Sequence, residues 1–222
     1  MDQLSLTLVT DRSQTVGRDL ITVISECLAV GLPAVQVREK DLSGKDLAIL
    51  CRRLRNLTRD TGAMLIVNDR VDVALTVGAD AVQRTGTSLD VKDMRDIAGR
   101  QLRIGASVHS LEEGLDAEQQ GADWVVLGPV YDTPSKRAYG EPLGLDRLAA
   151  VVRRLKIPVL AIGGITPERA PEVMAVGASG VGVISGILAA EWPSEATQLY
   201  LKALGGRGRR TPRRLRKKSS TS

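Results

Sequence analysis

Aromatic side chains are scarce in this sequence. Phenylalanine is absent, and tryptophan and tyrosine together supply only 2% of the 222 residues. Proteins that bind single-stranded nucleic acid stack the bases on exposed aromatic rings, and this chain has too few rings to build such a surface. We therefore expect no specific nucleic-acid partner.

Cysteine and long apolar runs are also scarce. Cys27 and Cys51 lie in stretches of helical periodicity, with no CxxC spacing and no histidine nearby. We expect neither a disulfide nor a metal site at them, and place both in or near the core. No apolar run reaches the roughly 18 residues that a membrane helix needs. Residues 1–4 lack the basic and apolar character of an export signal, so we expect a cytoplasmic protein without membrane contact.

Positive charge is concentrated at the C-terminus. The formal net charge is +5, but residues 205–222 hold eight Lys and Arg and no acidic residue, and the rest of the chain is slightly acidic. Like charges among Gly, Pro, Ser and Thr cannot bury a core, so we expect 205–222 to be a disordered basic tail. Such a tail either binds an anionic surface or is a solubilising appendage. Residues 1–204, in a chain that is 43% hydrophobic, are enough for one catalytic domain.

Short apolar runs alternate with segments of helical period along the whole chain. The predicted strands are 5–10, 34–38, 64–68, 81–83, 103–107, 124–128, 157–162 and 181–184. The predicted helices between them are 16–30, 47–58, 71–76, 91–100, 111–120 and 145–155, with another beginning at Pro167. Eight consecutive units of this kind favour an α/β fold with a single closed (β/α)8 barrel, a TIM barrel.

Glycines end the last two predicted strands. Gly163 and Gly164 precede Thr166, a favourable N-cap, and Pro167, while Ile184 and Ser185 follow the eighth strand. Glycines allow backbone N–H groups to approach a ligand, and a helix N-terminus attracts anions, so this pattern is typical of phosphate binding. The alternative is a tight turn in which the glycines serve only backbone geometry and packing.

The predicted barrel brings polar side chains together at the carboxyl ends of its strands, where such barrels hold their active sites. Cationic residues there would neutralise phosphates, and Asn68 with Asp69 could hold Mg2+, which binds through few carboxylates plus substrate phosphates. We therefore expect a small substrate phosphorylated at more than one place. The residues at this rim are Thr10, Asp11, Gln36, Arg38, Lys40, Asn68, Asp69, 83–88, Ser107, His109, Thr133, Ser135, Lys136, Gly163, Gly164, Ile184 and Ser185.

Five motifs occur in a recognisable order. They are QVREK at 36–40, VNDR at 67–70, IGASVHS at 104–110, GPVYDTPSK at 128–136 and AIGGIT at 161–166. Together they resemble the thiamine-phosphate synthase and thiazole tautomerase superfamily from about residue 6 to residue 190. The resemblance implies a (β/α)8 barrel that acts in thiamine biosynthesis.

For the synthase, the resemblance implies that pyrophosphate leaves hydroxymethylpyrimidine diphosphate and that thiazole phosphate, or its carboxylate, captures the resulting cation. Mg2+, Arg38, Lys40 and Lys136 would stabilise the departing charge. The implied diphosphate site is Gln36, Arg38, Lys40, Asn68, Ser107 and Lys136, with Asp69 as a magnesium ligand. The implied thiazole phosphate site is Thr133, Ser135, Gly163, Gly164, Ile184 and Ser185.

One segment departs from the synthase pattern. Gln83 and Ser88 stand where the synthases have a histidine and a second magnesium-binding aspartate. A hydroxyl is a poor ligand for Mg2+, so Asp90, pyrophosphate oxygens or water would have to complete the site. This segment is closer to the tautomerases, in which the counterpart of His109 would move a proton.

Three functions therefore stay open. The synthase is favoured because the cations and Asp69 suit a diphosphate; the tautomerase is the alternative, and a non-catalytic binding or regulatory barrel is a third. A homo-oligomer also stays open.

Overall fold

Eight parallel strands close into a barrel in sequence order. The computed structural model describes residues 2–133 and 141–205. Its strands are β1 (Leu6–Val9), β2 (Ala34–Val37), β3 (Met64–Asn68), β4 (Ala81–Arg84), β5 (Arg103–Val108), β6 (Trp124–Leu127), β7 (Val159–Ile162) and β8 (Gly180–Val183). Each strand pairs with the next, and β8 pairs with β1 through Thr7 and Gly182. The predicted (β/α)8 barrel is confirmed.

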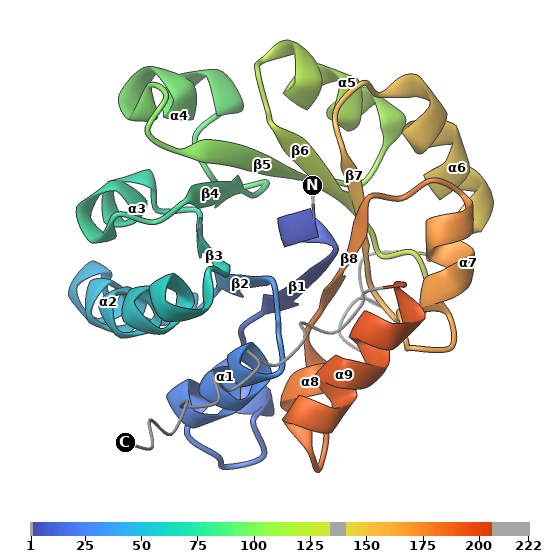
Figure 1. Ribbon diagram of the computed structural model, residues 1–222. Coiled ribbons are helices and arrows are strands. Elements are labelled where there is room, and N and C mark those ends of the chain that lie inside the picture. Colours follow the sequence, from blue (N-terminus) through green and yellow to red (C-terminus); the bar gives the residue numbers. More distant parts are fainter. Residues whose placement is uncertain (1, 134–140, 206–222) are drawn as a thin grey trace, which may run out of the picture.

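Helices surround the barrel as an outer layer (Figure 1). They are α1 (Leu20–Ala29), α2 (Gly44–Thr61), α3 (Val71–Val77), α4 (Val91–Ala98), α5 (Leu111–Gln119), α6 (Gly144–Arg154), α7 (Ala170–Ala175), α8 (Ser185–Leu188) and α9 (Pro193–Ala203). The helix α9 packs against α1 and α8 and so covers the junction of the first and last strands. Cys27 in α1 and Cys51 in α2 are buried in this layer, as expected.

Two helix boundaries differ from the prediction because of local capping. The first helix begins at Leu20 rather than at 16, since Val16 and Gly17 have φ angles of 55° and 80°, which no α-helix accommodates. Asp19 caps it by accepting a hydrogen bond from the Thr22 N–H at 2.9 Å. The second helix begins earlier than predicted, at Gly44, because Ser43 caps it in the same way.

The helix predicted to begin at Pro167 begins at Ala170 instead. The Thr166 carbonyl accepts from the N–H groups of Arg169 and Ala170 at 3.1 and 2.9 Å, which makes 166–169 a turn. Pro171 has no backbone N–H with which to bond the Pro167 carbonyl, so regular helical bonding begins only at Ala170. The helix α7 therefore starts after Pro167 and not at it, and the Arg169 Nη1 donates to the Gly164 carbonyl at 2.8 Å.

Apolar side chains fill the interior of the barrel below its polar rim. This inner cluster comprises Leu4, Ala34, Met64, Ile66, Ala81, Trp124 and Leu160. Leu4 closes the N-terminal end of the barrel, and the Trp124 indole is 1% exposed. Gly105 lies opposite Trp124 in the β5–β6 register, and a Cβ there would overlap the indole. The bulk of Trp124 thus requires glycine on the neighbouring strand.

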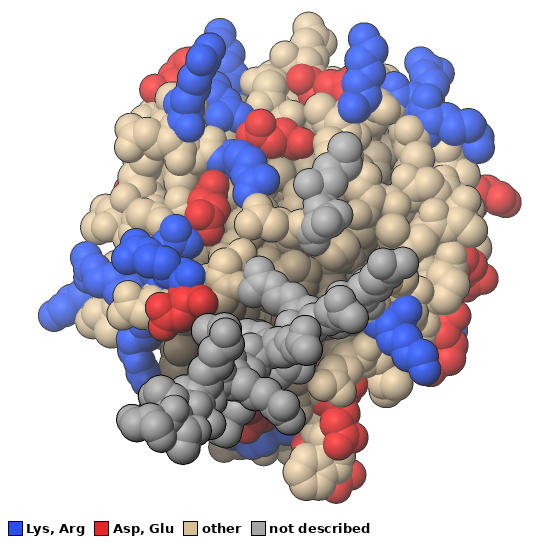
Figure 2. Space-filling model, in the orientation of Figure 1, with Lys and Arg blue, Asp and Glu red and all other residues tan. Residues whose placement is uncertain are grey.

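Charges of both signs are interspersed on the face seen in Figure 2. Acidic side chains gather along its lower right edge, over α7 and α9, which include Glu172 and Glu195. In the described ranges, no helix combines the length and apolar character needed to cross a bilayer. The predicted tail lies outside the described residues except for Gly205, so the domain boundary at 204 stays a prediction.

Candidate active site

Two side-chain pairs form a polar layer at the carboxyl ends of β2 to β5. The Gln36 Nε2 donates to the Asn68 Oδ1, and the Gln83 Nε2 donates to the Ser107 Oγ, each at 3.0 Å. Asn68 and Gln83 are register partners on β3 and β4, which joins the two pairs into one layer. Gln36, Asn68 and Gln83 are all buried. This layer separates the apolar interior from the mouth of the barrel.

Two buried polar atoms in or beside this layer make no hydrogen bond in the described chain. The Gln83 Oε1 and the Trp124 Nε1 are buried, and neither has a hydrogen-bond partner among the residues that the structure describes. Buried polar atoms of this kind are normally satisfied, often by a bound water molecule. Gln83 therefore orients Ser107 with the nitrogen of its amide, while the amide oxygen makes no hydrogen bond in the described chain.

Asp69 occupies the bend that follows β3. Its φ angle is 68°, in the left-handed region that aspartate tolerates better than most residues. Its N–H donates to the Gln83 carbonyl at 2.9 Å, which fixes the bend against β4. The carboxylate has no hydrogen bond or ion pair within 2–133 and 141–205, so its oxygens are open to a ligand. Strained residues held in this way are common at functional sites.

Ser88 and Asp90 are engaged within the loop after β4. The Ser88 Oγ accepts from the Thr85 N–H at 2.9 Å and lies 3.0 Å from the Thr85 Oγ1. The Asp90 Oδ1 pairs with the Arg84 Nη2 at 3.3 Å. Ser88 thus closes a turn, and neither residue adds an unengaged carboxylate to Asp69. Over the described residues, no group of three or more His, Cys, Asp or Glu side chains is arranged to hold a metal ion.

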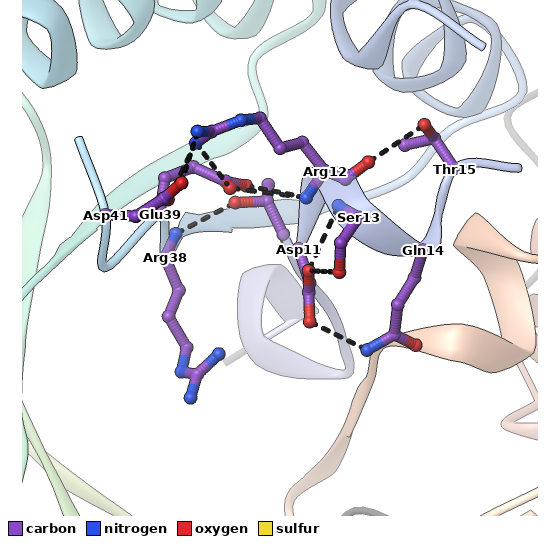
Figure 3. Close-up of polar contacts among 9 residues, drawn as sticks. Asp11, Arg12, Ser13, Gln14, Thr15, Arg38, Glu39 and Asp41 are labelled. Atoms are coloured by element: carbon purple, nitrogen blue, oxygen red, sulfur yellow. Dashed lines mark hydrogen bonds and ion pairs between the residues drawn. The ribbon is translucent and has the colours of Figure 1, made fainter. Parts of the chain in front are cut away.

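Arg38 and Lys40 follow β2 and line a pocket of about 570 Å3 together with Asp11, Arg12, Ser13, Glu39 and Asp41. The Thr10 Oγ1 accepts from the Arg38 N–H at 2.9 Å, which fixes the backbone of this loop against β1. The Arg38 guanidinium extends away from Glu39 and Asp41 (Figure 3). Neither Arg38 nor Lys40 has a side-chain hydrogen bond or ion pair in the described chain. Both cations are therefore available to an anionic ligand.

Asp11 stays ionised beside these cations. Hydrogen bonds from Ser13 lower the pKa of its carboxyl group, with further lowering by Gln14 and by the charge of Arg38 against the opposing effect of burial. The Gln14 Nε2 donates to it at 2.8 Å. Asp11 is thus committed to shaping the 3-10 turn Arg12–Gln14.

The glycines after β7 are required by the neighbouring loop. Gly163 and Gly164 have φ angles of 100° and 66°. The Tyr131 N–H donates to the Gly163 carbonyl at 3.0 Å. A Cβ on Gly164 would lie 2.7 Å from the Tyr131 Cβ and 2.8 Å from the Asp132 carbonyl oxygen. Close packing of the β6 loop, the alternative weighed for these residues, is therefore established, and a ligand is not needed to explain them.

The β6 loop leads towards the remaining predicted phosphate contacts. Thr133 ends its described part, and Ser135 and Lys136 lie outside the described residues. The Tyr131 hydroxyl donates to Glu172 in α7, and Arg169 stacks over the Tyr131 ring at 4.6 Å. These contacts attach the loop to α7.

Ile184 and Ser185 lie next to the two glycines because β7 and β8 are paired, with Ile162 opposite Gly182. The Ile184 carbonyl accepts from the N–H groups of Ile187 and Leu188, which starts the short helix α8. The N–H groups of its first residues have no acceptor within the helix. The structure thus brings together the described members of the predicted thiazole phosphate site on β7 and β8.

The His109 side chain lines a different pocket from the one that Arg38 and Lys40 line. Its Nδ1 lies 3.3 Å from the Glu113 Oε2, and its backbone N–H donates to the same oxygen at 2.7 Å. It lines a second pocket, of about 300 Å3, between α5 and α6, together with Leu111, Leu127, Leu143 and Arg147. His109 thus follows β5 at the carboxyl end of the strand, as predicted, but Glu113 engages its imidazole. The Ser110-x-x-Glu113 capping pattern in the sequence indicates that the Glu113 side chain folds back towards His109.

Comparison with known proteins identifies the family of this chain. The family model described as thiamine monophosphate synthase matches residues 6–187. The chain belongs to the thiamine monophosphate synthase family. All the described site residues, from Gln36 to Ser185, lie within the range that this family model matches.

Individual members of the thiamine monophosphate synthase family are similar over most of their length. A Geobacter sulfurreducens protein, provisionally named a thiamine-phosphate synthase, is 46% identical over 92% of this chain and 96% of its own. The thiamine-phosphate synthase of Moorella thermoacetica is 40% identical over 86% of this chain and 90% of its own. The structure of a thiamine phosphate pyrophosphorylase from Pyrococcus furiosus matches with a TM-score of 0.84 and 38% identity, over 91% and 96% of the two chains.

Proposed function

We propose that the protein condenses hydroxymethylpyrimidine diphosphate with thiazole phosphate to give thiamine phosphate and pyrophosphate; with the thiazole carboxylate phosphate the same condensation would also release CO2. The observation that carries the proposal is the pair of unengaged cations, Arg38 and Lys40, in a loop held to β1 at the barrel mouth. A diphosphate is the substrate group that needs such a pair of cations. A phosphorylated thiazole alone would occupy only the part of the site at β7 and β8. Membership of the synthase family supports the assignment.

At the diphosphate end, Arg38 and Lys40 would bind the phosphate oxygens, with Lys136 as a third cation. Ser107, oriented by Gln83, would donate its hydroxyl to the same group. Fixed donors and cations stabilise the charge that develops on the leaving pyrophosphate more than they stabilise the ground state. The bond from the pyrimidine methylene carbon to the diphosphate oxygen breaks, and the thiazole nitrogen supplies the electron pair for the new C–N bond. No protein nucleophile is required.

Asp69 fits a magnesium site of one carboxylate. Its carboxylate is unengaged, whereas the Ser88 hydroxyl is committed to Thr85. We infer that Asp69 would hold Mg2+ together with diphosphate oxygens and water, a common arrangement for this ion. Bound there, the ion would add positive charge to that of Arg38 and Lys40 beside the leaving group. Because one carboxylate is a weak site, binding of Mg2+ should depend on the diphosphate.

At the other end, the thiazole phosphate would lie across the exits of β7 and β8. Gly164 and Ser185 would offer backbone N–H groups there, with Gly163 and Ile184 shaping the cradle. Thr133 and Ser135 of the β6 loop would complete it. The close packing of the glycines against Tyr131 would hold such a cradle in place.

The thiazole tautomerase, the alternative function, receives less support. His109 would be its proton carrier, but its imidazole faces Glu113 and is directed into the α5–α6 pocket. The named relatives described above are synthases. The non-catalytic barrel is disfavoured as well, since Arg38, Lys40 and Asp69 have no structural partners among the described residues that would explain them. Cytoplasmic location and oligomeric state stay predictions.

Two variants separate the synthase from the tautomerase. Ser88→Asp should add a second carboxylate near Mg2+, lower the Mg2+ concentration for half-maximal thiamine phosphate formation and raise the rate. His109→Asn should leave the rate of synthesis nearly unchanged. A tautomerase would give the inverse pattern, with His109→Asn losing about 10² to 10⁴ in the rate of thiazole isomerisation. If the folded wild type neither forms thiamine phosphate nor isomerises the thiazole, both catalytic proposals fail.

A further inference from the structure

Two cations and two acids alternate in the loop after β2. Arg38, Glu39, Lys40 and Asp41 follow one another directly. The chain leaves β2 at Arg38 and Glu39 and enters a turn at Lys40 and Asp41. Figure 3 shows Glu39 and Asp41 both at Arg12, and Arg38 directed away from them.

Arg12, in the loop after β1, holds both acids. Its backbone N–H donates to both carboxylate oxygens of Glu39 at 3.2 Å, and its Nη1 lies 3.3 Å from the Glu39 Oε2. The same Nη1 donates to the Asp41 Oδ1 at 2.9 Å, while Nη2 pairs with the Asp41 Oδ2. One guanidinium thus joins two neighbouring loops at the rim of the barrel (Figure 3).

The Glu39 contact is the more important of the two. The Glu39 side chain is 3% exposed and that of Asp41 is 70% exposed. An exposed ion pair contributes little, whereas a buried carboxylate that loses its partner must find another cation or take up a proton. The cations adjacent to Glu39 in the sequence are Arg38 and Lys40. Without the Arg12 guanidinium, Glu39 would keep only the backbone N–H of residue 12, and Arg38 and Lys40 are the cations that Glu39 and Asp41 would compete for.

We propose that Arg12 is a positioning residue for the diphosphate subsite. By engaging Glu39 and Asp41, it keeps Arg38 and Lys40 unpaired and directed towards the diphosphate. In this proposal Arg12 acts through Glu39 and Asp41 and not as a ligand of the diphosphate. The proposal rests on the proposed function. It adds the reason why the acids of this loop do not pair with its cations.

Binding of inorganic pyrophosphate, measured calorimetrically with Mg2+ at fixed ionic strength, tests the proposal without catalysis. Arg12→Gln should weaken pyrophosphate binding at least about fivefold, the scale of one redirected ion pair. Lys45→Gln is the matched control, because it removes one positive charge from an exposed position at the start of α2. We expect Lys45→Gln to change binding by less than about twofold, as for a charge without a specific contact.

A triple variant separates charge competition from simple support of the loop. Arg12→Gln combined with Glu39→Gln and Asp41→Asn removes both carboxylates of the loop after β2 and leaves Asp11 engaged by Ser13 and Gln14 as in the wild type, so binding should return to within about twofold of the wild type. In turnover, Arg12→Gln should raise the KM for the pyrimidine diphosphate and leave the KM for thiazole phosphate unchanged.

Three results would overturn the proposal: normal pyrophosphate binding by Arg12→Gln, a triple variant as weak as the single one, or equal increases in both KM values. If Arg12→Gln does not fold, Arg12→Lys replaces it, because one ammonium group cannot engage both acids in the same way. Failure of the wild type to make thiamine phosphate would refute the proposed function alone, since pyrophosphate binding by the variants is measured independently.

Discussion

Replacing Gly105 by alanine should damage both the fold and the site, because the two meet at this residue. A Cβ on Gly105 would overlap the Gln83 Oε1 and the Trp124 indole. Neither neighbour has room to retreat, since both side chains are about 1% exposed. Overpacking of this kind costs about 1–3 kcal/mol. Displacing the Gln83 amide would also weaken its hydrogen bond to Ser107, at about 0.5–1.5 kcal/mol.

The expected total is a loss of about 2–4 kcal/mol in the free energy of unfolding. For a domain of this size that lowers Tm by roughly 5–15 °C, measured by circular dichroism. Gly114→Ala is the matched control, because Gly114 lies within helix α5 and its new Cβ would meet only the flexible Leu155 side chain, at 3.1 Å. There the helix preference for alanine, worth about 0.5–1 kcal/mol, opposes the tighter contact. A Gly105→Ala protein that melts within about 1 °C of the wild type would refute this description of the interior.

The remaining predictions concern the tail, the cysteines and the β7 glycines. A chain that ends at Leu204 should keep its Tm to within about 4 °C and its activity, because 205–222 offers little apolar surface to bury; a larger drop would show that the tail packs. Burial raises the pKa of the Cys27 thiol to about 11 and that of Cys51 to about 12. Neither thiol should therefore react with a thiol reagent at neutral pH until the protein is unfolded. Rapid labelling of the native protein would contradict their burial. Gly164→Val should lower the Tm, since its side chain would collide with Tyr131, and should weaken the affinity for thiazole phosphate at least about tenfold. Normal binding by a folded variant would place the cradle elsewhere.

The barrel and its rim could be predicted because both follow from local patterns. Eight apolar runs of strand length separated by helical segments leave few alternatives, and the active end of a closed parallel barrel is fixed by its topology. Gln36, Asn68 and Ser107 were assigned to the rim on these grounds, and the structure places them in one polar layer with Gln83.

Side-chain pairing across long sequence separations could not be predicted in the same way. Arg12 contacts Glu39 across 27 residues, and no periodicity reports which loops touch. Gly163 and Gly164 were interpreted through a ligand, but their surroundings depend on where the β6 loop returns. The start of α7 was a local error instead, because Pro171 lacks the N–H that helical bonding from Pro167 needs.

Local bonds that compete for a functional group were also missed. Ser88 and His109 were assigned by their positions in motifs. In the structure each is engaged nearby, by Thr85 and by Glu113. Both contacts span only three or four residues, so turn and capping patterns could have indicated them.

The most direct test of the account is product formation by the full chain. Purified protein is incubated with hydroxymethylpyrimidine diphosphate, thiazole phosphate and Mg2+, and thiamine phosphate and pyrophosphate are measured together, with a variant carrying Arg38→Gln and Lys40→Gln in parallel. We predict equal amounts of the two products from the wild type and a large loss in the variant. A folded wild type that forms no thiamine phosphate, or a variant as active as the wild type, would contradict the account.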